Sequence, residues 1–182
     1  MEAIALCAVV SSLSRPRATD LAVLPDLFLG PLAGRADFDW YQAPPGKWCP
    51  AQIVQHLALS LEYSARTFEA RREHAAMRRR PRSAIELIGY YLVLGMGWIP
   101  SGRRSPTATR PAEQPERTTV ERQFREAVER LGVLGRELLP ARRADLFAKH
   151  PVLGDLTLPE WQRFHLLHCA HHAKQIRARL AA

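Results

Sequence analysis

The chain of 182 residues contains little cysteine. Cys7, Cys49 and Cys169 are odd in number and widely separated, and no Cys-x-x-Cys pair occurs. This scarcity argues against a disulfide framework, in which cysteines come in pairs. It favours a protein kept in a reducing compartment, and we expect a cytoplasmic location.

Long apolar runs are missing as well. The longest apolar segment, residues 87–100, is shorter than a membrane-spanning helix and contains three glycines. A short apolar run at residues 3–10 follows Glu2, where a secretory signal would have basic residues. We therefore expect residues 1–17 to form an extension, disordered or helical, ahead of a single domain over residues 18–182.

Lysine is scarce, so the net charge of +8 is carried almost wholly by arginine. A basic balance can attract nucleic acid or an anionic membrane. The basic runs at 71–72 and 78–80, however, have no interleaved aromatic residues on which bases would stack. We favour a solvated arginine-rich surface, with nucleic-acid binding as a less favoured alternative, and we expect no membrane partner.

Helical periodicity accounts for most of the remaining sequence, and no alternating strand pattern bounded by hairpin turns appears. Pro25 is expected to kink or divide the first helix. The helix at 83–98 is apolar nearly all round, which predicts burial. We expect an all-α chain, with helices over residues 18–32, 50–80, 83–98, 118–140 and from 157 to near the C-terminus.

Start and stop signals support these boundaries. Residues 118–121 and 157–160 both read Thr-x-x-Glu, the pattern of a capping box. Pro81 and Pro140 are expected to end the helices before them. Residues 100–115, rich in Pro, Arg, Ser and Thr, form a loop long enough to be functional or mobile.

Three histidines carry the strongest indication of chemistry. His168 and His172 lie four residues apart, so a helix places both imidazoles on one face, one turn apart. Two imidazoles leave the coordination of a metal ion incomplete, and His56 on the earlier helix could supply a third ligand. Three protein ligands with one position open are typical of a catalytic metal site. The alternative is an incidental pair of histidines on a histidine-containing helix.

Each histidine lies in a narrow polar stripe framed by apolar residues, as helical positions of 100° per residue show. Facing helices of a bundle are where such sites are built. The agreement between the two stripes favours a metal site over an incidental pair. The first stripe contains Gln52, His56, Ser60, Tyr63 and Thr67, and the second Trp161, His168, His172, Gln175 and Arg179.

Other residues of the stripes have weaker claims. Gln175 could orient a histidine through a hydrogen bond, or it could simply pack. Arg179 could pair with a substrate carboxylate, although an arginine that extends to solvent near a helix end is the favoured interpretation. Cys169 points about 100° away from His168 and is expected to belong to the core. His171 is expected to lie behind the ligands or at the surface.

The segments around the three histidines resemble motifs of a known family. The segment Trp48-x-Pro50-x-x-Ile53-x-x-His56-Leu57 resembles the second-helix motif of the DinB-like (DinB/YfiT-like) superfamily, and His168-x-x-His171-His172-x-x-Gln175-Ile176 resembles the motif of its closing helix. The segment from His150 to Trp161 is similar to a subgroup of undefined function. The resemblance implies a four-helix bundle, usually dimeric, with a divalent zinc or nickel ion held by His56, His168 and His172.

The resemblance also implies a reaction. Members with known activity include transferases and isomerases that use low-molecular-weight thiols. We therefore expect a metal-dependent transferase acting on a small molecule, with Gln175, Ser60 and Tyr63 as candidate catalytic residues. The alternatives are a non-catalytic metal-binding or ligand-binding helical module and a metal-dependent hydrolase. Apolar residues beyond the need of one small bundle predict a homodimer, through the first helix or through Tyr90, Tyr91, Leu92, Val93, Leu94 and Met96.

Overall fold

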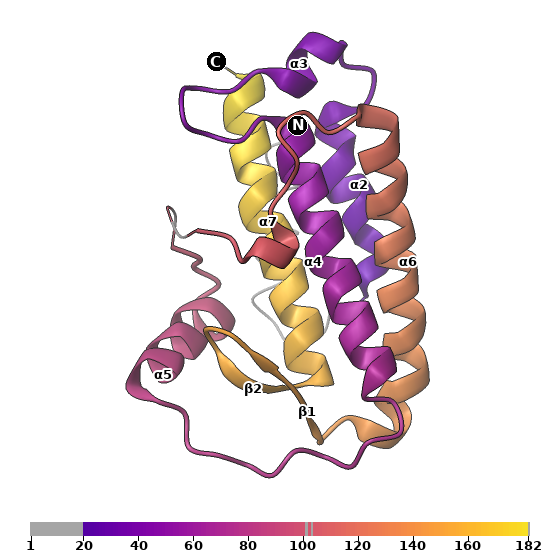
Figure 1. The fold of residues 1–182 in the computed structure, drawn as a ribbon, viewed down its shortest axis with the longest axis vertical. Coiled ribbons are helices and arrows are strands. Elements are labelled where there is room, and N and C mark those ends of the chain that lie inside the picture. The colour runs from indigo at the N-terminus through magenta and orange to yellow at the C-terminus, as the bar shows by residue number, and fades with distance from the viewer. Residues whose placement is uncertain (1–19, 101, 103, 182) are drawn as a thin grey trace.

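The computed structural model describes residues 20–100, 102 and 104–181. The described part is mostly helical with one two-stranded sheet, so the all-α expectation holds apart from the strands. The predicted extension at 1–17 lies outside the described residues. Four helices run side by side along the long axis of the molecule (Figure 1), namely α2 (Leu24–Leu29), α4 (Pro50–Ala70), α6 (Arg117–Arg142) and α7 (Leu158–Leu180).

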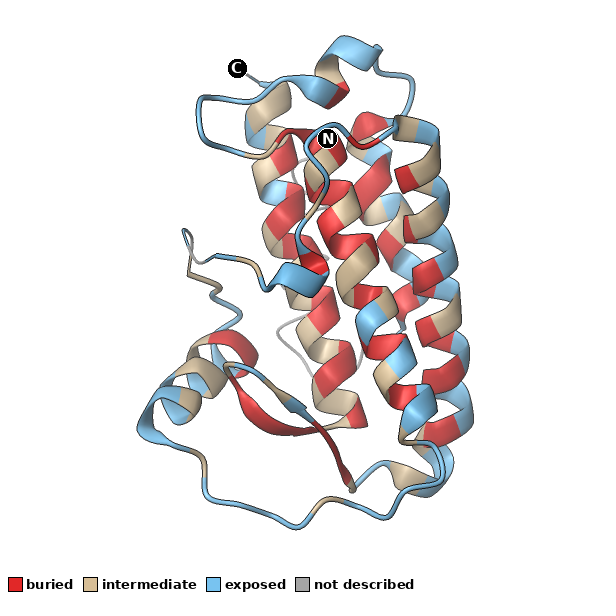
Figure 2. Ribbon diagram, in the orientation of Figure 1, coloured by how far each residue is buried: buried red, intermediate tan, exposed pale blue. Residues whose placement is uncertain are grey.

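The core lies between these helices, whose buried residues face one another (Figure 2). Pro25 divides the first helical stretch as predicted, because it stands in the first turn of α2, between the 3₁₀ turns η1 (Leu21–Val23) and η2 (Gly30–Leu32). A short helix, α3 (Asp37–Tyr41), follows in what the sequence indicated to be a connector, and its Trp40 is buried in the core.

Helix α4 ends at Ala70, so the prediction that it reaches residue 80 was wrong. Residues 71–80 have no buried side chain that would hold a helix against the core, and packing of an apolar face supplies most helical stability. The Arg142 guanidinium donates hydrogen bonds to the carbonyl oxygens of Arg71, Arg72 and His74, at 3.0, 2.8 and 2.6 Å. Carbonyls at and just beyond the helix end are thereby satisfied, and the chain continues without helical structure.

The expected buried helix at 83–98 is shorter and far more exposed than predicted. It consists of α5 (Ala84–Tyr90) and the π-helical turn η3 (Tyr91–Gly95), which lie beside α2, α4, α6 and α7 (Figure 1). Only Val93 and Leu94 of this segment are buried, because these four helices already fill the core. The exposed apolar surface of this segment, which we term the α5 surface, consists of Ile85, Leu87, Ile88, Tyr91, Met96 and Trp98.

A β-hairpin corrects the expectation of no strands. β1 (Leu146–His150) pairs antiparallel with β2 (Gly154–Thr157), with an irregularity between Leu146 and Ala148. The first three residues of each strand are all buried, so neither strand has the alternation that marks a half-exposed strand. The hairpin is tied to α7 by the Trp161 indole, which donates to the Ala148 carbonyl at 3.1 Å.

Two signals for α6 were misjudged. Its N-cap is Glu116, whose carboxylate accepts from the backbone N–H groups of Thr118 and Thr119 at 2.8 and 2.7 Å, so the predicted capping box at 118–121 does not form. Pro140 lies inside the helix instead of ending it, close enough to the C-terminus for the lost hydrogen bond to be tolerated.

Helix α7 begins as predicted. Thr157 is its N-cap, with its hydroxyl accepting from the Glu160 N–H at 3.4 Å and the Glu160 carboxylate accepting from the Thr157 N–H at 2.7 Å. This reciprocal pair satisfies two donors that a helix start otherwise leaves unpaired. It therefore fixes where the helix that carries His168 and His172 begins.

Replacement of Thr157 by alanine should lower the free energy of unfolding by about 1 kcal/mol, the usual loss for an N-cap. Urea denaturation followed by circular dichroism measures the change. Thr118→Ala is the matched control, because Glu116 caps α6, and it should change the free energy by less than about 0.5 kcal/mol. An equal loss in both variants would show that the α7 cap has no special role.

Candidate metal centre

Helices α4 and α7 bring the three predicted histidines together. The Nε2 atom of His168 lies 3.3 Å from that of His56 and 3.2 Å from that of His172. One ligand atom from each of the three rings lies within 4.8 Å of the other two. His56 and His172 are buried, whereas His168 is partly exposed. The cluster thus combines a buried setting with one accessible side.

His56 is oriented by the loop between α5 and α6. Its Nδ1 atom lies 2.7 Å from the Thr109 carbonyl oxygen, which can only accept, so Nδ1 bears the proton. In the neutral ring this leaves the Nε2 lone pair pointing into the cluster. Thr109 belongs to the 3₁₀ turn η4 (Thr107–Thr109) and is itself buried.

His172 is oriented in the same way by Gln175. The Gln175 Oε1 atom accepts from His172 Nδ1 at 2.9 Å. The Nε2 atom of Gln175 donates to His171 Nε2 at 3.0 Å. The amide therefore fixes the proton of His172 on Nδ1 and frees its Nε2 lone pair for the cluster. His171 lies behind this pair, as the helical geometry predicted.

The three nitrogens fit a shared cation better than they fit one another. His56 and His172 both present lone pairs, and the single proton of a neutral His168 can satisfy only one of them through Nε2. If that proton is on Nδ1 instead, three lone pairs converge. Two ligands about 2.0–2.1 Å from one tetrahedral ion lie about 3.3–3.4 Å apart, close to the two separations that involve His168.

Burial keeps these rings neutral, which is the state that binds a metal. Desolvation, followed by the charges of neighbouring histidines, lowers the pKa of His172 to about 3 and that of His168 well below its ordinary value. Desolvation also lowers the pKa of His56, against a smaller raising effect of the Thr109 carbonyl. The donor set, the tautomers and the protonation state therefore agree with a metal centre.

The candidate catalytic residues on α4 have other surroundings. The Ser60 hydroxyl donates to the His56 carbonyl at 2.8 Å, within its own helix. Tyr63 has a 55% exposed side chain, and Thr67 bonds the Tyr63 carbonyl at 2.8 Å in the way that Ser60 bonds His56. The C-terminal members of this polar stripe, from Ser60 onward, thus face solvent or bind the backbone of their own helix.

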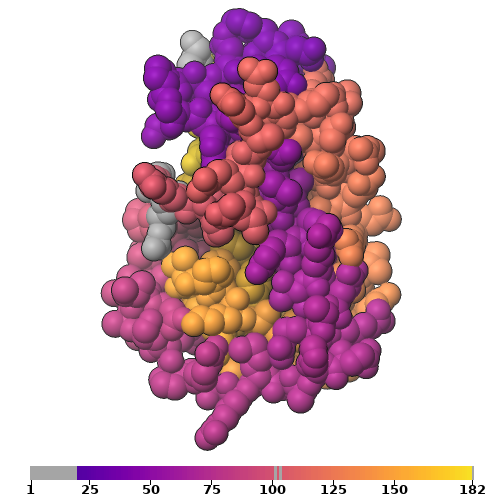
Figure 3. All heavy atoms as spheres, viewed as in Figure 1, coloured from indigo at the N-terminus to yellow at the C-terminus, as the bar shows by residue number. Residues whose placement is uncertain are grey.

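Residues 104–115, the described part of the predicted loop, lie across the N-terminal half of α4 in Figure 3. Gln52 Nε2 donates to the Glu113 carbonyl at 2.9 Å, and Gln55 Oε1 accepts from the Ala112 N–H at 2.7 Å. Sequence reasoning noted this loop as functional or mobile but missed its contact with His56. The periodicity of a helix carries no information about a partner that lies fifty residues away.

Two further residues of the site were missed or misjudged. The centroid of the Trp48 ring lies 5.0 Å from that of the His56 ring, so Trp48 packs against one side of the cluster. Arg179 does not extend freely to solvent, because its guanidinium donates to the carbonyls of Trp48 and Gln175 at 2.5 and 2.8 Å. Cys169, by contrast, is fully buried as predicted.

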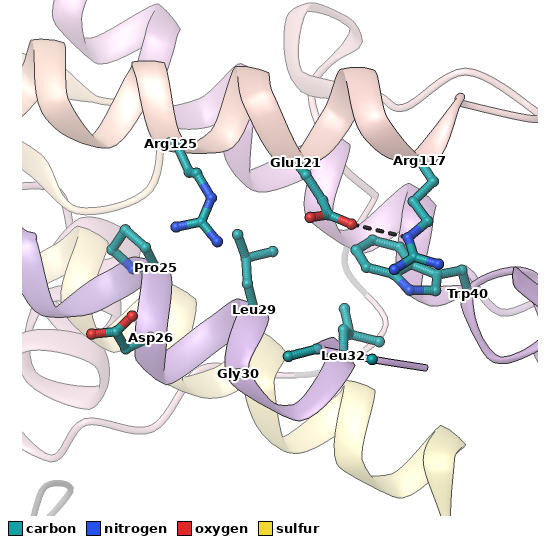
Figure 4. Close-up of a pocket in the computed structure, with 11 residues that line it drawn as sticks. Pro25, Asp26, Leu29, Gly30, Leu32, Trp40, Arg117, Glu121 and Arg125 are labelled. Carbon is teal, nitrogen blue, oxygen red and sulfur yellow. Dashed lines mark hydrogen bonds and ion pairs between the residues drawn. The ribbon is translucent and has the colours of Figure 1, made fainter. Parts of the chain in front are cut away.

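A separate cavity of about 220 Å³ lies between α2, η2 and the first turns of α6 (Figure 4). It is lined by Trp40, Arg117 and Glu121 among others. Arg117 is paired with Glu121 at 3.0 Å and its guanidinium lies 4.8 Å from the Trp40 ring centroid. Asp26 and Arg125 are the other charged residues of the lining, and no histidine of the cluster lines the cavity.

The fold and the site define a mostly helical protein with a three-histidine cluster that could hold a metal ion. Within the described residues, no helix is both long enough and apolar enough to cross a membrane. The chain belongs to the family described as "Protein of unknown function (DUF1569)", whose model matches residues 39–179. Comparison with curated proteins and with solved structures found no match.

Two histidines outside the cluster, His150 and His165, should make the stability of the protein sensitive to acid. Burial lowers the pKa of His150 to about 4, and burial followed by the charge of His150 lowers that of His165 to about 3. The unfolded chain binds these protons near pH 6.5, so stability is present above that pH and declines toward pH 4 and below. Each ring contributes at most about 1.4 kcal/mol per pH unit in this window.

Urea unfolding of chelator-treated protein at pH 7.5, 6 and 5 measures this decline. His150→Asn should reduce the slope, because asparagine has no group that titrates in this range, while its Oδ1 atom can accept from the Val152 and Leu153 N–H groups that His150 Nδ1 accepts from at 3.1 and 3.2 Å. A midpoint that stays constant from pH 7.5 to 5 would contradict the buried, neutral state of these rings.

Proposed function

We propose that the protein is a metal-dependent transferase that acts on a small molecule together with a low-molecular-weight thiol. His56, His168 and His172 are the proposed ligands of a divalent ion, zinc or nickel. The observation that carries the proposal is the convergence of three Nε2 atoms, two of them with lone pairs fixed by hydrogen bonds from Nδ1. We further propose that α2, α4, α6 and α7 form a DinB-like bundle.

A divalent metal held by neutral imidazoles keeps its positive charge, which favours the thiolate form of a bound thiol. The chain's own contribution is to hold the ligands in place. Thr109 and Gln175 orient His56 and His172, and burial of these rings excludes water from two sides of the cluster. The partly exposed side of His168 is the proposed route for the thiol and the acceptor.

Ser60 and Tyr63 are proposed contacts for the acceptor. They follow His56 on α4 at four and seven residues, so their backbones lie about 6 and 10 Å farther along the same face. The exposed Tyr63 ring is free to approach a bound molecule, whereas Ser60 would have to release the His56 carbonyl first. An acceptor that spans one or two helical turns would meet both residues.

Protein purified without a histidine tag should contain about one divalent ion per chain, measured by inductively coupled plasma mass spectrometry. Alanine at His56, His168 or His172 should remove the metal and the activity together. Gln175→Ala keeps all three ligands and should weaken metal affinity by about 10–100-fold. His74→Ala is the matched control, because this histidine is exposed and outside the cluster.

Cobalt-loaded protein mixed with a panel of cellular thiols and electrophiles tests the reaction itself. A thiolate charge-transfer band and product formation support the transferase. If no thiol produces the band and activity persists without metal, the transferase proposal fails. Metal binding without any turnover would favour a non-catalytic binding module. Turnover of an electrophile with water as the only co-substrate would favour a hydrolase.

We also propose that the α5 surface packs against a second copy of the chain. Its apolar side chains are exposed in the single chain, and contiguous apolar patches on soluble proteins commonly mark interfaces. Ile88→Arg should convert a dimer to a monomer in sedimentation equilibrium, whereas Val133→Arg, an exposed site on α6, should not. A wild-type chain that is monomeric at high micromolar concentration would refute this assembly.

A further inference from the structure

The guanidinium of Arg179, like that of Arg82, donates to backbone carbonyls and to no carboxylate of the described residues. Other arginines reach carboxylates, such as Arg80 with Asp155 and Arg117 with Glu121. Arg179 donates only to backbone carbonyls, through Nε to Trp48 and through Nη1 to Gln175. Among the residues that the structure describes, no carboxylate forms an ion pair with it. Its positive charge, partly withdrawn from solvent, therefore has no counter-charge there.

The two carbonyls place this charge at the edge of the histidine cluster. Trp48 is the residue whose ring lies 5.0 Å from His56, and Gln175 is the residue whose side chain holds His172. Arg179 therefore connects the segment before α4 to the last turns of α7, next to two of the three proposed ligands. A guanidinium fixed by two hydrogen bonds loses little further freedom when it binds a ligand.

The guanidinium also has donors to spare. Two of its five N–H groups are used, and neither hydrogen of Nη2 has a described partner. Nη2 is not among the fully buried side-chain atoms that lack a partner, and Arg179 as a whole is partly exposed. The planar fork of arginine matches the two oxygens of a carboxylate.

We propose that Arg179 binds a carboxylate of the substrate, and that the thiol used at this centre is a small carboxylate-bearing thiol. This inference rests on the proposed function, because it names the substrate class of the same site. The carboxylate binds the guanidinium while the sulfur reaches the open side of the three histidines. Arg179 is thus a specificity-determining residue, and it does not itself contact the metal.

Titration of cobalt-loaded protein with two thiols tests the proposal. 3-Mercaptopropionate should bind roughly tenfold more tightly than 2-mercaptoethanol, as expected for charge-assisted hydrogen bonds at a partly exposed site. The thiolate charge-transfer band reports both affinities. Arg179→Gln should abolish the preference but leave cobalt content and 2-mercaptoethanol affinity unchanged, with folding checked by circular dichroism. 2-Mercaptoethanesulfonate shows whether a sulfonate can replace the carboxylate.

Lys174→Gln is the matched control, because it removes one exposed positive charge from the same helix without a fixed fork. Equal affinity of the wild-type protein for both thiols would overturn the proposal, as would an equal loss of preference in the Lys174 variant.

A second experiment separates the carboxylate site from the proposed function. Butyrate is titrated into metal-free protein while the Arg179 Nε–H resonance is followed by NMR. A saturable shift supports the carboxylate site even if no thiol binds the metal, and an unmoved resonance refutes it.

Discussion

The packing of α7 against α4 is the contact on which the histidine cluster depends. Each helix buries apolar residues beside its polar stripe, Ile53 and Leu57 on α4 and Cys169 and Ile176 on α7. Burying imidazoles costs free energy unless they are hydrogen-bonded, and apolar burial on either side offsets that cost. The backbones are therefore fixed by the core, and the histidine side chains need only small adjustments to converge.

A second support comes from outside the helices. Residues 104–115 are held by Gln52 and Gln55, and this segment orients His56 through the Thr109 carbonyl. A loop with few buried residues thus contributes directly to the geometry of a buried ring. The arrangement explains why the first two residues of the α4 polar stripe are polar, since Gln52 and His56 both bind backbone carbonyls of this segment.

The sequence predicted the mostly helical class, the start of α7 and the histidine cluster because these follow from local rules. Spacing of 3.6 residues per turn places His168 and His172 on one face, and the Thr157 capping box requires only neighbouring residues. The failures depend on distant partners. The end of α4 depends on Arg142. The exposure of α5 depends on how many other helices fill the core. The hairpin was missed because strands buried at consecutive positions show no alternation.

The three proposed ligands differ in what supports them. Those on α7 share one rigid helix, so their mutual spacing is set by helical geometry alone. The ligand on α4 is oriented by a carbonyl from a surface loop, a kind of segment that tolerates sequence change. Substitutions in that loop would alter the orientation and basicity of one ligand while the core stayed intact. Related chains can therefore diverge in metal affinity, and in which metal they prefer, without any change in the helices that carry the ligands.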